Sequence, residues 1–236
     1  MAQSEKYGRT YHYPFSPGTT SDDRINHDYW LDVQRIDKLV HTEKMDGENN
    51  CLSRFGVFAR SHAAPTASPW TTTIRQYWGQ IRRELGELEV FLENCYAIHS
   101  LQYRQLDHHF YVFAVREKGI WLSWEETKFY AALLDLPTVP ELSITTTPAS
   151  KSRFEEDLLQ LTAGPGRYDP VDAVTGKPAS MEGIVSRNMA HYATEAFKNN
   201  VFKYVRKGHV KTDEHWTRHW KRAPLIQEGG NYVATD

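Results

Sequence analysis

Short apolar runs of strand length recur along this chain, and several of them contain charged residues. The run Leu88–Ala97 contains Glu93, and the run Asn200–Arg206 contains Lys203. Runs of this length and apolarity predict strands. A charge inside an apolar strand is costly unless it is paired or bound to a metal. The charges therefore either lie on solvated strand faces or meet in a common site, and the runs alone leave both interpretations open.

The segment Thr42–Asn49 places a lysine, an aspartate and a glycine in the order K-x-D-G. It follows an apolar pair and precedes another strand-like run, so Lys44 is predicted near a strand end, with Gly47 allowing a tight turn. A lysine that is desolvated and set among other cations can lose its proton and attack phosphorus. For the tetrapeptide taken alone, an exposed turn lysine is the simpler explanation.

Helical spacing of apolar residues and capping patterns predict helices between the strand-like runs. A capping box at Ser123–Glu126 marks the start of one helix. Residues 1–20 have no clear period and predict an irregular N-terminal arm, and residues 222–236 predict a polar tail. The helices expected from these patterns cover residues 22–37, 73–85, 123–136, 152–161 and 212–221.

Composition restricts the class of protein. The formal net charge of the 236 residues is −2, so a nucleic-acid surface has to be local, and Lys203–Lys211 is one basic stretch. No apolar run approaches the ~20 residues that span a bilayer, which argues against a membrane partner. Two cysteines make no disulfide framework, and the N-terminus has no secretory pattern. A reducing, cytoplasmic location is the expectation.

Six segments then occur in a fixed order along the chain. They are Lys44–Asn49, Ala59–Ser61, Glu93 within F-L-E-N-C-Y-A-I-H-S, Phe110–Phe113, Glu182–Val185 and Phe202–Val205. This series resembles the motifs of the covalent nucleotidyltransferases, the superfamily of DNA and RNA ligases and capping enzymes. It is most similar to the ATP-dependent RNA ligases of the phage T4 RNA ligase 2 type, over roughly residues 38–211. Each segment alone is a weak signal, whereas six in order are a strong one.

The resemblance implies an α+β nucleotidyltransferase (ATP-grasp-like) fold, with mostly antiparallel sheets flanking a nucleotide cleft and helices outside. It implies one adenylyltransferase domain over residues 1–236. It also implies that Lys44 takes AMP from ATP, that the AMP passes to a 5′-phosphate end, and that a 3′-hydroxyl displaces it. The substrate would be RNA or a nicked nucleic-acid duplex, and the cofactors ATP and Mg²⁺, with Mn²⁺ as a substitute.

The resemblance also assigns residue roles. Lys44, Glu182 and Lys203 would be catalytic, and Glu93 and Glu182 would hold the metal. The implied nucleotide contacts are Asp46 and Glu93 at the ribose, Asn49 and Arg60 near phosphates, Phe113 on adenine and Lys203 at the α-phosphate.

Two features depart from the family pattern. The branch often has a second lysine where this chain has Val205, and strand alternation turns Arg206 away from the face of Lys203. The 25 residues after Lys211 are too few for the OB-fold of DNA ligases and capping enzymes. Two further hypotheses stay open: a same-fold enzyme acting on DNA or hybrid nicks or using GTP, and a non-catalytic nucleic-acid-binding relic.

Overall fold

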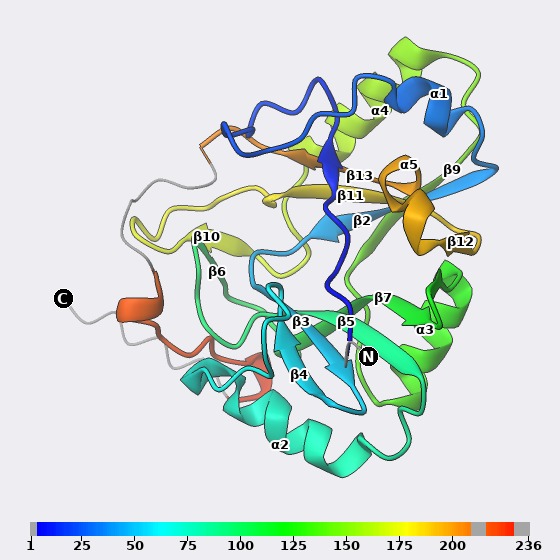
Figure 1. Ribbon diagram of the computed structural model, residues 1–236. Helices are drawn as coiled ribbons and strands as arrows, with labels where there is room; N and C mark the ends of the chain where they lie inside the picture. Colours follow the sequence, from blue (N-terminus) through cyan, green and yellow to red (C-terminus); the bar gives the residue numbers. More distant parts are fainter. Residues whose placement is uncertain (1–3, 209–215, 229–236) are drawn as a thin grey trace.

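The computed structural model describes residues 4–208 and 216–228, and its two main sheets lie one above the other in Figure 1. The upper sheet has the strand order β1-β13-β11-β2-β9. All neighbours in it pair antiparallel except β1, which runs parallel to β13. Its strands are β1 (Tyr11–His12), β2 (Lys38–Lys44), β9 (Glu141–Thr146), β11 (Gly183–Asn188) and β13 (Val201–Val205).

The lower sheet has six strands in the order β12-β8-β7-β5-β3-β4, all antiparallel. A separate antiparallel pair joins β10 and β6. The strands of these two sheets are β3 (Glu48–Ser53), β4 (Gly56–Ala59), β5 (Leu88–Asn94), β6 (Leu101–Tyr103), β7 (Phe110–Glu117), β8 (Ile120–Trp121), β10 (Pro170–Asp172) and β12 (Tyr192–Ala193). The expected α+β fold with antiparallel sheets is confirmed.

Helices cover the outer faces of both sheets (Figure 1). The lower sheet packs against α2 and α3 through a cluster that includes Ile74, Val90 and Ala131. The upper sheet packs against α1 and α4 through Tyr29 and Phe154. The helices are α1 (Tyr29–Val33), α2 (Thr72–Ile81), α3 (Trp124–Leu133), α4 (Lys151–Ala163) and α5 (Phe197–Asn200), and the 3₁₀ turns are Pro69–Thr71, Thr194–Ala196, Trp216–Arg218 and Ile226–Glu228.

The lysine segment is the link between the two sheets. Strand β2 of the upper sheet ends at Lys44, and β3 of the lower sheet begins at Glu48. Strand β11 pairs with β2 so that Gly183 lies opposite Lys44, and β5 pairs with β3 so that Glu93 lies opposite Asn49. These registers bring the charged strand residues toward one place between the sheets.

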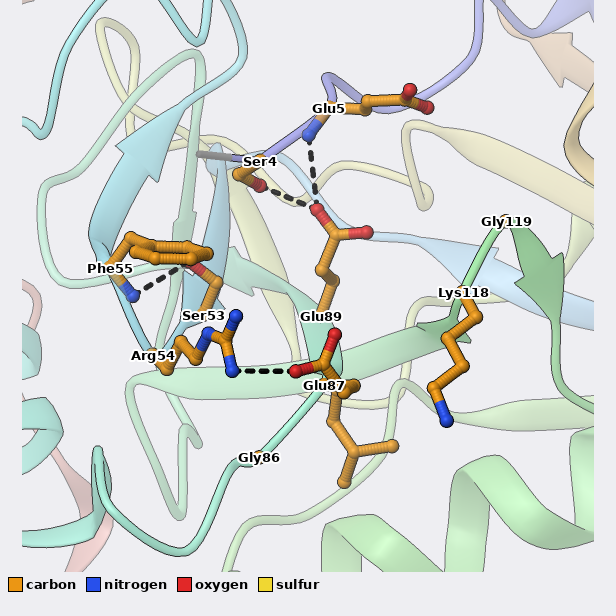
Figure 2. Close-up of a pocket in the computed structure, with 11 residues that line it drawn as sticks. Ser4, Glu5, Ser53, Arg54, Phe55, Gly86, Glu87, Glu89, Lys118 and Gly119 are labelled. Atoms are coloured by element: carbon orange, nitrogen blue, oxygen red, sulfur yellow. Dashed lines mark hydrogen bonds and ion pairs between the residues drawn. The ribbon is translucent and has the colours of Figure 1, made fainter. Parts of the chain in front are cut away.

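The arm spans both sheets. At its start, the Oγ of Ser4 and the backbone N–H of Glu5 both donate to Glu89 of the lower sheet (Figure 2). Further on, His12 pairs with Lys203 on β13 of the upper sheet. Residues 4–12 therefore run from Glu89 on β5 of the lower sheet to β13 of the upper sheet.

The helix expected over 22–37 is wrong except for its last part, because only Tyr29–Val33 is α-helical. Ile25 is 37 % exposed and forms a bridge with His12, so it does not belong to a buried helical stripe. The carboxylate of Asp23 is engaged by Thr20 and by Lys203. Residues 20–26 therefore form a turn followed by an irregular segment that contacts the upper sheet.

The other helix predictions fare better. The capping box of Ser123 and Glu126 is present with both of its hydrogen bonds. Helix α4 begins one residue before Ser152, and Ser150 caps it by accepting from Arg153. The helix expected over 212–221 falls partly outside the described residues. Within the part of the chain that is described, no helix has the length and apolarity to cross a bilayer.

Candidate active site

A cavity of about 790 Å³ opens beside the end of β2. Its lining comes from both sheets and from the arm. Five of the residues implied by the motifs contribute to it, namely Lys44, Asn49, Arg60, Glu93 and Phe113. The strand registers thus assemble, in one hollow, side chains that are up to 69 residues apart in the sequence.

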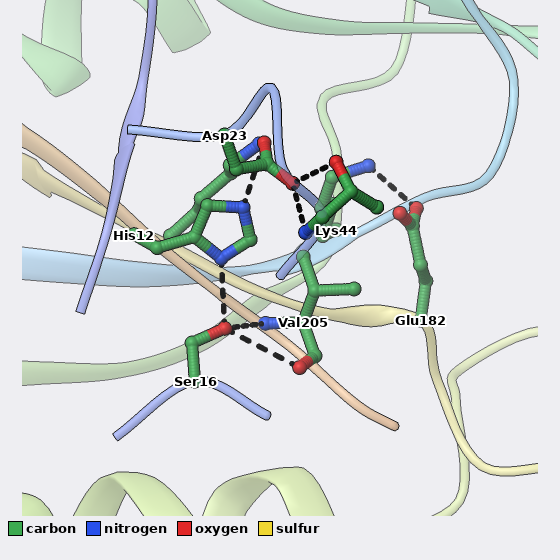
Figure 3. Close-up of polar contacts among 8 residues, drawn as sticks. His12, Ser16, Asp23, Lys44, Glu182 and Val205 are labelled. Carbon is green, nitrogen blue, oxygen red and sulfur yellow. Dashed lines mark hydrogen bonds and ion pairs between the residues drawn. The ribbon is translucent and has the colours of Figure 1, made fainter. Parts of the chain in front are cut away.

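Lys44 and Glu182 form the central contact of the site. The Lys44 Nζ lies 2.6 Å from Glu182 Oε2 (Figure 3). The Glu182 side chain is 4 % exposed and that of Lys44 is 27 % exposed, so the amine still reaches the solvent of the cavity. Glu182 directly precedes β11, whose pairing with β2 fixes this approach.

Glu93 is the second carboxylate beside the lysine. It belongs to β5 and accepts a hydrogen bond of 3.0 Å from the backbone N–H of Gly47. Burial raises the pKa of Glu93 to about 7; the ammonium of Lys44 opposes this and the carboxylate of Glu182 adds to it. Glu93, which the sequence left as either a solvated or a functional residue, therefore faces the site.

The charges that act most strongly on Lys44 are carboxylates. Burial lowers the pKa of Lys44, yet Glu182, Glu93 and Asp46 outweigh burial and hold that pKa above the ordinary value. The lysine is consequently an ammonium in this state. It can act as a nucleophile only after a charge that enters the cavity shifts the balance.

The glycines of the motifs, Gly47 and Gly183, allow neighbouring backbone segments to approach closely. A Cβ at Gly47 would lie 2.6 Å from the backbone oxygen of Asn94, and one at Gly183 would lie 1.9 Å from that of Tyr204. Neither glycine has a positive φ, so the bend at Gly47 between β2 and β3 does not use a left-handed conformation. Only a residue without a side chain lets β5 and β13 come this near to the lysine and to Glu182.

Lys203 projects from β13 and is 17 % exposed. Its Nζ lies 3.1 Å from Asp23 Oδ1, and the same oxygen lies 3.0 Å from Nε2 of the fully buried His12. Burial lowers the pKa of Lys203, and the nearby charges of Lys44 and Arg60 lower it further. Lys203 therefore belongs to the same electrostatic environment as the other two cations.

Asn49 and Arg60 bring polar groups to the cavity wall. Arg60 is exposed directly after β4, and Asn49 lies on β3. Within the described residues, the buried Oδ1 of Asn49 has no hydrogen-bond partner. A buried polar atom that faces a cavity without a partner is suited to a ligand that supplies one.

Phe113, on β7 of the lower sheet, also lines the cavity and is 5 % exposed. Tyr7 of the arm meets it edge-on at 5.1 Å between ring centroids, and the Arg187 guanidinium lies 5.3 Å from its ring centre. Val185 also lines the cavity. An aromatic ring and an aliphatic side chain on the same cavity offer the apolar surfaces between which a nucleobase can stack.

Asp46 is placed differently from the other motif residues. Its Oδ2 accepts a hydrogen bond of 2.7 Å from the backbone N–H of Leu101, and its own N–H donates to Tyr103. It is 7 % exposed and is not part of the cavity lining. In this state it organises the backbone under the lysine, and its contact with a ribose stays a prediction.

The acidic residues fit a divalent ion that arrives with a phosphate ligand. Mg²⁺ is commonly held by one or two carboxylates together with substrate phosphates and water. Glu93 and Glu182 supply two carboxylates beside Lys44, and the charge of each raises the pKa of that lysine. Among the described residues, no group of three or more His, Cys, Asp or Glu could hold an ion by itself. The donor set therefore fits Mg²⁺ or Mn²⁺ bound with a nucleotide.

Sequence reasoning missed several residues of the site. Tyr7 and His12 come from the arm, which has no strand or helix period that would reveal their position, and Asp23 lies in the segment that was predicted to be helical. The sequence did contain a signal for Val185. It lies two residues after the glycine of the E-G pair, and strand alternation places residues two apart on the same face.

Val205, the position of the missing second cation, is buried at 5 % exposure. Its Cγ1 lies 2.8 Å from where a Cβ at Gly18 would stand, and its backbone N–H donates to Ser16 (Figure 3). The arm covers this position, so a lysine side chain would have to displace it.

Comparisons with known proteins agree with this geometry. A model of the RNA ligase family matches residues 37–205. An arginine-to-alanine variant of Naegleria gruberi RNA ligase with ATP and Mn has 16 % identity and a TM-score of 0.54, over 93 % of this chain and 59 % of that one. A glutamate-to-alanine variant of the same ligase, with ATP and Mn, has 17 % identity and a TM-score of 0.53, over 86 % and 60 %.

An archaeal ATP-dependent RNA ligase covers 83 % of this chain and 48 % of its own, with 18 % identity and a TM-score of 0.49, which is too low to carry an argument. The chain thus spans 48 % to 60 % of the length of these structures. At such identities the likeness shows the fold. A search of curated proteins gave no significant match.

Proposed function

We propose that this chain, which belongs to the RNA ligase family, is an ATP-dependent ligase that joins RNA ends through a lysyl-AMP intermediate on Lys44. The observation that carries the proposal is the Lys44 amine at 2.6 Å from Glu182, inside a cavity lined by Glu93, Arg60 and Phe113. A lysine nucleophile needs a partner that orients it and can take its proton, and Glu182 is within hydrogen-bond reach.

The first step forms one bond and breaks another. The Lys44 ammonium first gives one proton to Glu182, which lies within hydrogen-bond reach. The neutral amine then attacks the α-phosphorus of ATP, a P–N bond forms, the bond to pyrophosphate breaks, and the second proton of the nitrogen leaves with the pyrophosphate or to solvent. Lys203 and Arg60 stabilise charge that develops on the phosphate oxygens. A bound Mg²⁺ would be held by Glu93 and Glu182 and would withdraw negative charge from the phosphates.

The later steps act on RNA. The AMP passes from Lys44 to a 5′-phosphate end, and a 3′-hydroxyl then attacks that end and releases AMP. RNA carrying these two ends is therefore the proposed substrate, and a nick in a duplex is the proposed junction. The exposed Arg60 beside the cavity is a phosphate contact suited to such an end.

The test is the intact mass of the protein after incubation with ATP and Mg²⁺, with GTP in a parallel reaction. We expect a gain of one AMP with ATP, and none in Lys44→Ala. Lys38→Ala is the matched control, because Lys38 is an exposed lysine at the other end of the same strand. Prior treatment with pyrophosphate removes any AMP acquired during expression. No gain after that treatment, or labelling that survives in Lys44→Ala, would refute the proposal.

A further inference from the structure

The carboxylate of Asp23 contacts the ammonium of Lys203 beside the cavity. We propose that Asp23 is a positioning residue for Lys203: it holds the ammonium at a fixed place beside Lys44 and keeps it charged. This inference rests on the proposed function, because it assigns Lys203 the task of binding a phosphate.

The carboxylate of Asp23 is fully engaged. Its Oδ1 lies 3.0 Å from His12 Nε2 and 3.1 Å from Lys203 Nζ. Its Oδ2 accepts from the backbone N–H of Thr20 at 3.0 Å and from the Thr20 hydroxyl at 3.1 Å. A carboxylate fixed at both oxygens has one orientation, and it therefore defines where the Lys203 ammonium lies. The Lys203 ammonium has three N–H donors and contacts Asp23 with one of them, so two donors remain for other partners.

The backbone holds this group in register. His12 pairs with Lys203 along β1 and β13, and the N–H of Tyr13 donates to the carbonyl of Lys203 at 2.9 Å. Ser16 Oγ lies 2.8 Å from His12 Nδ1 and accepts from the N–H of Val205 at 2.9 Å (Figure 3). A displacement of Asp23 would thus have to break a set of contacts to the strand that carries Lys203.

The charges around Lys203 explain why the carboxylate of Asp23 matters for the protonation of this lysine. Lys44 and Arg60 are the cations that act on it from the other elements of the site, and His12 contacts the same Asp23 oxygen as Lys203 does. Burial lowers the pKa of Lys203 first and these two cations lower it further, whereas Asp23 raises it. Replacing Asp23 by an uncharged residue leaves only the lowering influences, so Lys203 would give up its proton at a lower pH.

The main experiment compares Asp23→Asn with a matched control, Asp32→Asn. Asp32 is 6 % exposed and binds Asn26 and Asn199 near the same segment, without contacting Lys203. Single-turnover AMP labelling is followed by mass over a range of ATP concentrations. We expect the maximal rate of Asp23→Asn to fall on the order of tenfold to hundredfold, with a smaller change in the half-saturating ATP concentration. Equal losses in the two variants would mean that arm stability alone matters, and would overturn the proposal.

A second measurement does not depend on activity. The side-chain NMR signal of Lys203, identified by its disappearance in Lys203→Arg, is titrated with pH in each protein. We expect the Lys203 pKa to be lower in Asp23→Asn than in the wild type and unchanged in Asp32→Asn. An unchanged Lys203 pKa in Asp23→Asn overturns the proposal. If no protein is labelled by ATP, the proposed function fails, whereas this titration still tests the coupling.

Asp23→Glu covers the case in which Asp23→Asn does not fold. It keeps the charge but moves the carboxylate by one methylene. We expect its Lys203 pKa to stay near that of the wild type while the labelling rate falls. A wild-type rate in Asp23→Glu would show that the place of the ammonium is not set by Asp23, and would overturn the positioning role.

Discussion

Replacing Lys44 by methionine tests how the charge of the site is balanced. Lys44 is the cation whose pKa is raised jointly by Glu182, Glu93 and Asp46. Methionine fills similar volume but leaves the carboxylates without that counter-charge. We expect Lys44→Met to be less stable than the wild type, although removing a functional residue often stabilises a protein.

The magnitude follows from burial. Removing one partner of a buried ion pair costs roughly 3–5 kcal/mol. Glu182 is 4 % exposed but Lys44 is 27 % exposed, so the lower end, about 3 kcal/mol, is expected. Without Lys44, the pKa values of the carboxyls rise in the folded protein. A carboxyl whose pKa is higher in the folded than in the unfolded protein lowers the free energy of unfolding as pH rises above the unfolded pKa of about 4.5. The destabilisation of Lys44→Met should therefore be small near pH 5 and complete near pH 8.

The assay is the free energy of unfolding in urea at both pH values, with the m-value checked for constancy. Glu182→Gln should cost less, because Lys44 still has Glu93 and Asp46 beside it. The double variant Lys44→Met/Glu182→Gln should be more stable than Lys44→Met alone, by about 1 kcal/mol or more. Wild-type stability of Lys44→Met at pH 8, or a loss that is equal at both pH values, would refute this account of the charge balance.

Two further predictions concern buried positions. Val205→Lys should lower the free energy of unfolding by roughly 2–4 kcal/mol, because it buries an ammonium under the arm. The control is Val174→Lys, at a site that is 71 % exposed. Equal stability of the two variants would contradict the burial of Val205. Burial lowers the pKa of His41 to about 4, from an ordinary 6.5, so the neutral form should contribute stability that is lost as pH falls from about 6.5 to 4, by roughly 3 kcal/mol. His41→Gln should flatten this part of the stability profile, and an unchanged slope would show that His41 is not responsible.

The sequence predicted the strands better than it predicted the path of residues 22–37. Strand-like runs around Glu93 and Lys203 formed strands, because alternation and apolarity are local properties of the chain. The helix expected over 22–37 failed because Asp23 and Ile25 make contacts with distant residues that a local pattern does not contain. Local preference is a weak predictor wherever tertiary contacts of this kind compete with it.

By itself the sequence determined the strands around Glu93 and Lys203 and the α+β class, because these depend on residue order and short-range period. It also predicted Lys44 as the nucleophile and Glu93 and Glu182 as the carboxylates beside it. Only the tertiary structure decided that Lys44 is held as an ammonium by Glu182 and Glu93, because that depends on distances between β2, β5 and the start of β11. It also decided that Gly47 and Gly183 are needed for close approach, and that Asp23 contacts Lys203. These properties arise where two sheets and the arm meet, and burial and charge at such a place depend on neighbours that the sequence alone does not identify.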